Sequence, residues 1–337
     1  MTPFNAGIIG LGAIGSLQDE DKKVEGIYSH AGAIDAIKEY NLIAVCEPRR
    51  DRLEVSKKMW GVKKGYTNIA EFLENEPLHT VSICTPDETH FAVLKQVLTC
   101  AKHIKVIITE KPLVLSYDEC REIRDLATEK KVLIEVNNQR RVDGSHIEAS
   151  KLIKEGELGM IQGVSAYYVK GLFHIASTMV DTLMMLLGDI KWVQAIPPFF
   201  KGKYGNSDFS TDFILGFKDD VTAVVQSCDK GGYWYSIFEI DVLGAKGRLC
   251  ISENGTCIEH FKVVEYPNYP GFSVLGEPVR IPGDMNFAIL HLFKTVLQEL
   301  RDGVFGLGKF ALEAMKGIRI LEMVRESEKM SISKVHV

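Results

Sequence analysis

The feature that most constrains the fold is a regular alternation of short apolar runs and helical patterns over the first 137 residues. The runs are nearly continuous in Val, Ile, Leu and Ala, as expected for parallel strands that are covered on both faces. Such alternation implies right-handed crossovers and a doubly wound α/β sheet. The expected strands are Ala6–Gly10, Leu42–Glu47, Thr80–Thr85, Ile104–Thr109 and Val132–Val136, and the expected helices are Asp51–Trp60, Ile69–Glu74, His90–Cys100 and Tyr117–Lys130.

The pattern changes after about residue 140. Turn signals now separate several strand-like runs, which indicates a mainly antiparallel sheet. We therefore expect an α/β domain at residues 1–137 and an α+β domain at residues 138–337. The expected strands of the second part are Ile161–Lys170, Trp192–Ile196, Phe213–Phe217, Val221–Ser227, Ser236–Leu243, Gly247–Ser252 and Thr256–Val264, and its expected helices are His146–Glu155, Ile175–Leu187, Met285–Arg301 and Leu307–Ser327.

Composition excludes several classes of protein. The net charge is −5 with both signs interspersed, so the chain lacks the basic face of a nucleic-acid-binding protein. Its seven cysteines are scattered and never spaced C-x-x-C, which indicates a reducing compartment and no zinc site. We expect no bound metal. Neither a signal peptide nor an apolar stretch of the roughly 18 residues needed to span a bilayer is present, so we expect no membrane partner and a cytoplasmic location.

The first expected strand leads into Gly10-Leu-Gly12-Ala13-Ile14-Gly15. A dinucleotide pyrophosphate needs a tight turn, a backbone without side chains and a helix N-terminus that offsets its charge. Glycines at these three positions meet those needs, and their place in the first strand–helix connection identifies a Rossmann domain. Gly10, Gly12, Ala13, Ile14 and Gly15 are therefore predicted to bind the cofactor.

The second expected strand ends at Glu47, whose carboxylate could accept both ribose hydroxyls of the adenosine half. An acidic group here favours NAD, because it would repel the 2′-phosphate of NADP. Arg49 and Arg50 follow at once and could instead bind that phosphate, so NADP is the alternative. The spacing from the glycine turn is longer than usual, which indicates an insertion at Gln18–Ile27 before a helix that starts near Ser29–His30.

Two further segments lie where strands are expected to end, at the carboxyl edge that binds ligands in this fold. One carries Thr85, Pro86 and His90, and the other carries Glu110, Lys111 and Pro112. A lysine at this edge would face the nicotinamide, where partial desolvation can lower its pKa towards neutrality. Lys111 is therefore a candidate proton relay between an alcohol and a ketone.

Gly10-x-Gly12-x-x-Gly15, Thr85-Pro86-x-x-x-His90 and Glu110-Lys111-Pro112, in this order, resemble the glucose–fructose oxidoreductase / inositol dehydrogenase / rhizopine catabolism family. The resemblance runs over nearly the whole chain. It implies a Rossmann domain, an open-faced sheet domain and oxidation or reduction of a sugar or cyclitol with NAD or NADP. It further implies that the residues at these motifs contact the cofactor, and that Lys111 contacts both the substrate and the nicotinamide ribose.

The family's second signature, roughly Asp-x-Gly-x-His-x-x-Asp, matches the stretch from His174 to Asp181 with two departures. His174 stands where many members have Asp, as in a branch resembling surface-polysaccharide and amino-sugar enzymes. Thr178 stands where most members have the catalytic histidine. The two positions are four apart on an expected helix and share one face, so His174 could take over the proton transfer. Alternatively, His174 only packs at the helix start.

The remaining candidate substrate residues lie between and beside these motifs. Asn138 and Arg140 belong to a stretch resembling the family's Asn-x-x-Arg, and amides and guanidinium groups suit hydroxyl-rich or phosphate-bearing substrates. One of Arg140 and Arg141 is expected to form an interdomain ion pair. Tyr168 and Lys170 are expected to share one face of a strand. The predicted substrate set is Asn138, Arg140, Tyr168, His174, Thr178 and Asp181.

These features together predict an NAD(P)-dependent oxidoreductase. It would move a hydride between nicotinamide and a secondary hydroxyl or ketone of a sugar or nucleotide-linked sugar, with Lys111 and His174 as the catalytic pair. We expect a homodimer or homotetramer formed through the C-terminal sheet. The alternative is a sugar- or dinucleotide-sensing regulator that lost catalysis, which Thr178 would fit.

Overall fold

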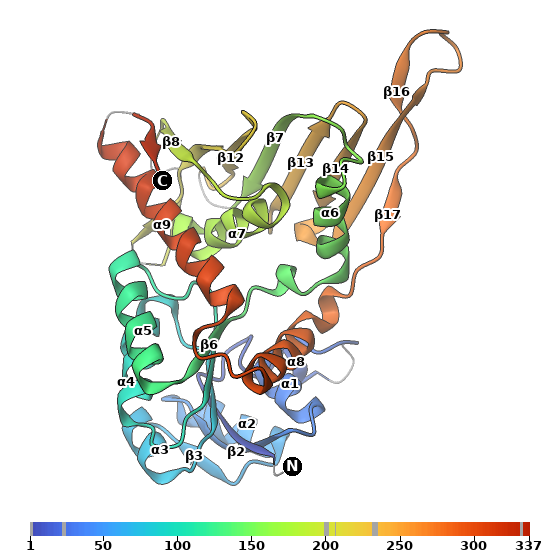
Figure 1. Ribbon diagram of the computed structural model, residues 1–337. Coiled ribbons are helices and arrows are strands. Elements are labelled where there is room, and N and C mark those ends of the chain that lie inside the picture. The colour runs from blue at the N-terminus through green and yellow to red at the C-terminus, as the bar shows by residue number, and fades with distance from the viewer. Residues whose placement is uncertain (1–2, 22–24, 199–201, 206, 231–234, 331–332) are drawn as a thin grey trace. The chain divides into compact units, whose positions relative to one another are not determined.

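The computed structural model describes residues 3–21, 25–198, 202–205, 207–230, 235–330 and 333–337 (Figure 1). The chain forms two compact units. The first contains Met1–Val142 and Met285–Lys316, and the second contains Asp143–Asp284 and Gly317–Val337. None of the helices in the described residues is long and apolar enough to cross a membrane.

The first unit is built on a parallel sheet, as the apolar runs predicted. Among the described residues its strand order is β18-β6-β5-β4-β1-β2-β3, so the order reverses between β1 and β4. Ligands bind at such a reversal, outside the carboxyl ends of the strands. The strands are β1 (Phe4–Ile9), β2 (Tyr40–Cys46), β3 (Lys64–Tyr66), β4 (Thr80–Ile83), β5 (Val106–Thr109), β6 (Leu133–Val136) and β18 (Gly306–Leu307).

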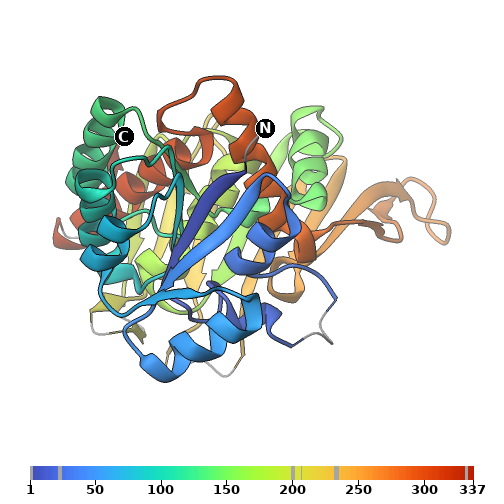
Figure 2. The same cartoon turned by 90° about the horizontal axis from the view of Figure 1, so that it is seen from below.

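Helices cover both faces of this sheet (Figure 2), with α4 and α5 on one face and α1 and α8 on the other. Four expected helices are confirmed to within one residue at each end, because strong apolar periodicity and clear caps define them. Ser116, for example, accepts a hydrogen bond from the Glu119 amide at the start of α5. The helices are α1 (His30–Ala36), α2 (Arg50–Trp60), α3 (Ile69–Asn75), α4 (His90–Cys100), α5 (Tyr117–Lys130) and α8 (Ala288–Arg301).

The boundary between the compact units differs from the expected division at residue 137. Residues 138–142 and 285–316 belong to the first unit. The reason is packing: Leu292 and Phe293 of α8 are fully buried in the same apolar cluster as Ile8 and Ile34. β18 also pairs in parallel with β6 and extends the sheet. The chain therefore returns to complete a core that its first 137 residues leave open.

The second unit contains a mainly antiparallel sheet, as predicted, with β7 and β12 as a parallel pair. Along strands such as β7 and β8, buried residues alternate with half-buried ones. One face of the sheet therefore packs on helices and the other is open. The helices are α6 (Gly144–Lys154), α7 (Ala176–Leu187) and the last part of α9 (Lys309–Lys329). The main strands are β7 (Ile161–Tyr168), β8 (Trp192–Ile196), β11 (Asp212–Gly216), β12 (Thr222–Ser227), β13 (Phe238–Gly244), β14 (Gly247–Ser252) and β15 (Cys257–Glu265).

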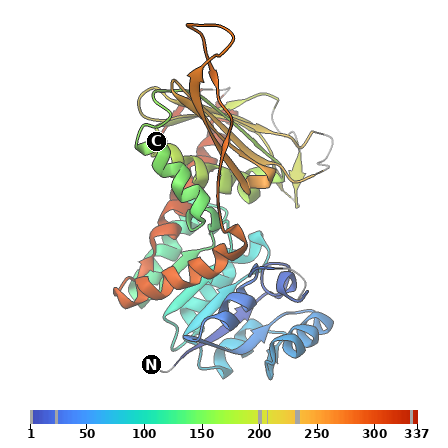
Figure 3. The ribbon, with the colours of Figure 1, turned by 90° about the vertical axis from the view of Figure 1, so that its right-hand side faces the viewer.

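Several short strands of the second unit were not predicted, because two or three residues carry no readable periodicity. They are β9 (Lys203–Tyr204), β10 (Asp208–Phe209), β16 (Ser273–Leu275), β17 (Val279–Ile281) and β19 (Val335–His336). The ribbon of β15 and β16 extends beyond the rest of the sheet (Figure 3).

A buried carboxyl group joins β6 to the start of α9. Glu135 is 0% exposed, and its two oxygens accept hydrogen bonds from the amides of Phe310 and Ala311 (3.2 and 2.8 Å). Burial and a second carboxyl group, Glu299, raise the pKa of Glu135 above its ordinary value of 4.5. The folded protein therefore keeps a proton here that the unfolded chain has already lost, and this costs stability as the pH rises above about 5.

We expect Glu135→Gln to remove this pH dependence. The stability of the variant relative to wild type should rise by at least about 1 kcal/mol between pH 5 and pH 8, since one pKa unit corresponds to about 1.4 kcal/mol. Thermal unfolding from pH 5 to pH 9 measures this. Glu129→Gln, at an exposed position of α5, is the control. A stability difference between variant and wild type that does not change with pH would show that the pKa of Glu135 is not raised in the folded protein.

Candidate functional site

The turn after β1 has a separate structural reason for each of its three glycines. Gly10 has a φ of +91°, and a Cβ there would lie 2.5 Å from the carbonyl oxygen of Cys84, directly after β4. A Cβ on Gly15 would collide with the carbonyl oxygen of Gly10. At Gly12 a Cβ would meet no atom of the described residues within 4 Å. Gly10 and Gly15 thus close the turn, whereas Gly12 leaves room for a diphosphate at the backbone.

The chain makes an excursion between this turn and α1. The carbonyl oxygens of Ile14 and Gly15 accept hydrogen bonds from the amides of His30 and Ala31 (2.9 and 3.1 Å). In an uninterrupted helix residue 18 would be the donor to Ile14, so about twelve residues are inserted here. α1 then begins at His30, with Ser29 as its N-cap. The predicted insertion and helix start agree with this geometry. Within the turn, Ala13 is exposed and Ile14 half-buried.

Glu47 directly follows β2 and lies against the glycine turn. One of its carboxylate oxygens accepts a hydrogen bond from the Leu11 amide (2.9 Å), and the other accepts one from the Arg49 side chain (2.9 Å). Burial opposes ionisation, but the hydrogen bonds from Arg49 and Leu11 lower the pKa of Glu47 below its usual value. A negative charge therefore stands where the adenosine ribose is expected, and Arg49 is partly neutralised by it.

His90 lies beneath the segment that follows β4 and connects it to the segment that follows β5. The ring is 0% exposed, with Nδ1 2.6 Å from the carbonyl oxygen of Pro112 and Nε2 2.9 Å from that of Thr85. His90 therefore ties the loops after β4 and β5 together from beneath. The ring thus has a supporting role in this conformation, and the cofactor contact predicted for His90 stays a prediction. Thr85 is half-buried and Pro86 exposed beside it.

Glu110, at the end of β5, also belongs to a supporting network. One of its oxygens lies 3.0 Å from Nε2 of His30 and accepts a hydrogen bond from the Asn137 amide (2.6 Å). Burial disfavours its charge, but His30, Asn137 and the neighbouring Lys111 lower the pKa of Glu110. An ionised carboxylate thus links α1 and the ends of β5 and β6 immediately before Lys111. The cofactor contact predicted for Glu110 stays a prediction.

Lys111, Asn138 and Arg140 follow the ends of β5 and β6 in the same unit. Lys111 and Arg140 are half-buried, and Asn138 is 4% exposed. Arg141 forms an ion pair with Glu313 (3.2 Å). Both partners belong to the first unit, so the ion pair expected between domains is here internal to one unit.

In the second unit His174 lies in a wide turn (Gly171–Ile175) that leads into α7. Asp208 of β10 accepts hydrogen bonds from three amides of this turn, including that of His174 (2.9 Å). Tyr204 of β9 stacks on the imidazole, with ring centroids 3.9 Å apart. The short β9–β10 hairpin therefore fixes both the backbone and the ring of His174.

The other predicted residues of the second unit are less open than expected. Tyr168 is 0% exposed, and its hydroxyl donates to the Thr211 carbonyl oxygen (2.7 Å), so it packs in the core here and its predicted substrate contact stays a prediction. Lys170 does not share a strand face with it, because β7 ends at Tyr168 and Lys170 has a φ of +66°. Thr178 and Asp181 are 8% and 3% exposed on α7, and their substrate roles stay predictions.

Sequence reasoning missed His30, Tyr204, Asp208 and the role of Asn137. His30 carries a signal, since it opens the first helix after the glycine turn, where its ring points at the strand ends. Asp208 and Tyr204 carry none, because their strands are too short to be read and they meet His174 only through the tertiary fold.

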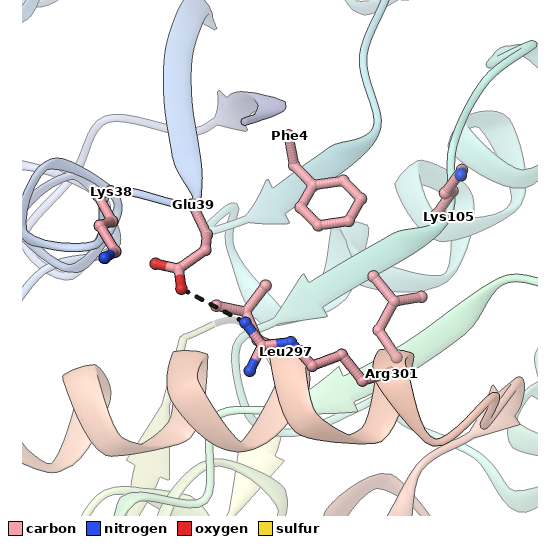
Figure 4. A pocket seen from close by; sticks show the side chains of 7 residues that line it. Phe4, Lys38, Glu39, Lys105, Leu297 and Arg301 are labelled. Atoms are coloured by element: carbon pink, nitrogen blue, oxygen red, sulfur yellow. Dashed lines mark hydrogen bonds and ion pairs between the residues drawn. The ribbon is translucent and has the colours of Figure 1, made fainter. Parts of the chain in front are cut away.

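The first unit also has a hollow that lies away from the glycine turn. It is lined by Phe4, Lys38, Glu39, Lys105, Leu297, Leu300 and Arg301, with an ion pair between Glu39 and Arg301 (Figure 4). Phe4, Glu39 and Lys105 stand at or just before the amino ends of strands, opposite the edge that carries the glycine turn. No cluster of potential metal ligands occurs in the part of the chain that the structure describes.

The glycine geometry gives a test of the cofactor turn. Gly12→Val should fold with a melting temperature near that of wild type, because the added side chain enters open space, yet it should weaken dinucleotide binding at least about tenfold. Gly15→Val should lower the melting temperature, because its side chain collides with the turn. Calorimetric titration and thermal unfolding of both variants measure these effects. Unchanged binding by the Gly12 variant would place the diphosphate elsewhere.

Comparison with known proteins supports the same interpretation. Residues 4–138 match the model of the GFO_IDH_MocA family, described as an oxidoreductase family with an NAD-binding Rossmann fold. The chain is 26% identical to myo-inositol 2-dehydrogenase of Thermotoga maritima over 262 residues, which cover 72% of this chain and 73% of that protein. It spans only 42% and 26% of the lengths of two uncharacterized oxidoreductases of Schizosaccharomyces pombe that it also matches.

Solved structures with the same fold include both an enzyme and a repressor. Levoglucosan dehydrogenase in complex with NADH and L-sorbose matches all of this chain and 99% of its own, with a TM-score of 0.74 and 16% identity. The super-repressor mutant of Gal80p from Saccharomyces cerevisiae matches 99% of this chain and 98% of its own, with a TM-score of 0.76 and 16% identity. These likenesses establish the fold alone. With the glycine geometry, the family match shows that residues 4–138 carry the NAD-binding Rossmann fold of the GFO_IDH_MocA oxidoreductase family.

Proposed function

We propose that this protein is an NAD(P)-dependent dehydrogenase or reductase acting on a secondary hydroxyl or ketone of a sugar or nucleotide-linked sugar. The observation that carries the proposal is the open approach at Gly12, at the reversal of strand order, in the same unit as Lys111 after β5. Relatives named as inositol dehydrogenases support a hydroxyl-rich substrate. A role in surface-glycan or amino-sugar synthesis is the narrower form of the proposal.

The cofactor supplies a nicotinamide carbon that accepts or donates the hydride. In the oxidative direction the substrate carbon loses a hydride and its hydroxyl loses a proton, which a side chain must accept. Lys111 would hold the substrate oxygen. The neighbouring Glu110 carboxylate would not fully neutralise the Lys111 charge, because it is shared with His30 and Asn137. His174 would be the second acid–base group, since imidazole is the side chain most often used for proton transfer in enzymes.

We expect Lys111→Met to leave the melting temperature near wild type and to reduce turnover by about 10²–10⁴-fold, the usual range for an acid–base group. Steady-state kinetics with NAD and a panel of sugars and cyclitols, combined with thermal unfolding, measure both effects. Lys130→Met, at an exposed end of α5, is the matched control. Unchanged turnover would make Lys111 a surface charge.

The His174 turn gives an independent test. His174→Ala should lower kcat by about 10²–10⁴-fold, the usual range for an acid–base group. Asp208→Asn should lower kcat while leaving dinucleotide affinity unchanged, because it loosens only the His174 turn. Thr178→Ala should weaken substrate binding by about 0.5–1.5 kcal/mol, the value of one hydrogen bond. Full activity of the His174→Ala variant would make this histidine structural.

The rival function is a sugar- or dinucleotide-sensing regulator. Thr178 favours it, because this residue replaces the usual histidine and is a poor base. Wild-type protein that binds dinucleotide and sugar but turns over none of the panel would support the regulator.

We also propose that the protein is cytoplasmic and forms a homodimer or homotetramer through its C-terminal sheet. The seven cysteines without disulfides support the location, and the open sheet face supports the oligomer.

A further inference from the structure

Side-chain hydrogen bonds join the first and last residues of the insertion between the glycine turn and α1. Asp19 closes it, since its carboxylate accepts hydrogen bonds from the amides of Tyr28 and Ser29 (2.9 and 2.7 Å) and from the Ser29 hydroxyl (2.6 Å). Gly32 of α1 leaves the space that this carboxylate occupies. The next residue of the excursion, Glu20, is thereby held in a fixed place.

Glu20 pairs with Arg52 in the first turn of α2. The carboxylate of Glu20 accepts from both terminal nitrogens of the guanidinium, one of them at 2.9 Å, and the side chains are only 13% and 11% exposed. Ser16 donates a hydrogen bond to Glu20 (2.6 Å), and its oxygen also accepts one from Arg52 (3.2 Å). The remaining guanidinium donor, Nε, binds the carbonyl oxygen of Leu11 (2.6 Å).

Leu11 therefore connects two charged groups. Its carbonyl oxygen accepts from Arg52, and its amide donates to Glu47 (2.9 Å). Backbone dimensions then keep the Arg52 Nε and the bonded Glu47 oxygen within about 10 Å of each other. The Debye length at physiological ionic strength is about 8 Å, but buried charges are screened much less than exposed ones, and the Arg52–Glu20 pair is largely buried. A phosphate bound near Glu47 would thus experience the charge state of the Arg52–Glu20 pair.

We propose that Glu20, supplied by the insertion, is a specificity-determining residue that withholds the Arg52 guanidinium from a 2′-phosphate and so favours NAD(H) over NADP(H). The inference rests on the proposed dinucleotide binding. Arg49 likewise pairs with Glu47, so each of these two arginines has a carboxylate partner. A 2′-phosphate brings about −1.5 to −2 charges near neutral pH, so it depends on an uncompensated cation far more than a ribose hydroxyl does.

The test is the ratio of the Kd values of NADP and NAD, measured by calorimetric titration of the full-length protein. Glu20→Gln should lower this ratio at least about fivefold, because Arg52 gains an uncompensated charge. Glu54→Gln, which removes an exposed carboxylate from α2, the helix that carries Arg52, should leave the ratio unchanged. A merely structural role for Glu20 would weaken both dinucleotides alike and leave the ratio within twofold of wild type, which would overturn the proposal.

Two further variants keep the test decisive. Arg52→Gln leaves the Glu20 carboxylate without its partner, so the ratio should rise instead of fall, and this result does not require the Glu20→Gln protein to fold. The Glu20→Gln/Arg52→Gln double variant should return the ratio towards wild type. A ratio that moves in the same direction in both single variants contradicts the proposal. Wild-type protein that binds neither dinucleotide would overturn the proposed function itself.

Discussion

The half-buried carboxylate of Glu110 is the interaction on which the site of the first unit depends. It joins the first residue of α1 to the ends of β5 and β6 through His30 and Asn137. A buried charge is costly unless its partners are in place, so the three elements can meet correctly only when this network is complete. Lys111 directly follows Glu110, so the same network holds the backbone that carries the Lys111 side chain.

Much of this unit could be predicted because its determinants are local. Continuous apolar runs define β1, β2, β4, β5 and β6, and each glycine of the turn answers a backbone requirement that the sequence already displays. Even the insertion before α1 was readable, from the spacing between the glycine turn and Glu47. The role of His90 was not, because the same spacing suits a ligand contact and a buried bridge between two carbonyl groups.

The second unit shows where local reasoning ends. Strand alternation placed Tyr168 on a face with Lys170, but the strand ends before Lys170, whose left-handed backbone breaks the alternation. His174 is oriented by Asp208 and Tyr204, which lie some 30 residues later in strands of two residues each. Such partners are specified by tertiary contacts, and a single sequence has no periodic signal for them.

The return of residues 285–316 to the first unit has a consequence for synthesis. A nascent chain that has emerged only as far as Val142 lacks α8 and β18, so the apolar faces that Leu292 and Phe293 later cover are still exposed to water. The dinucleotide-binding unit must therefore wait for nearly the whole chain, while Asp143–Asp284 emerges in between. Long-range contacts of this kind form late in synthesis and leave hydrophobic surface exposed meanwhile, a state that favours aggregation.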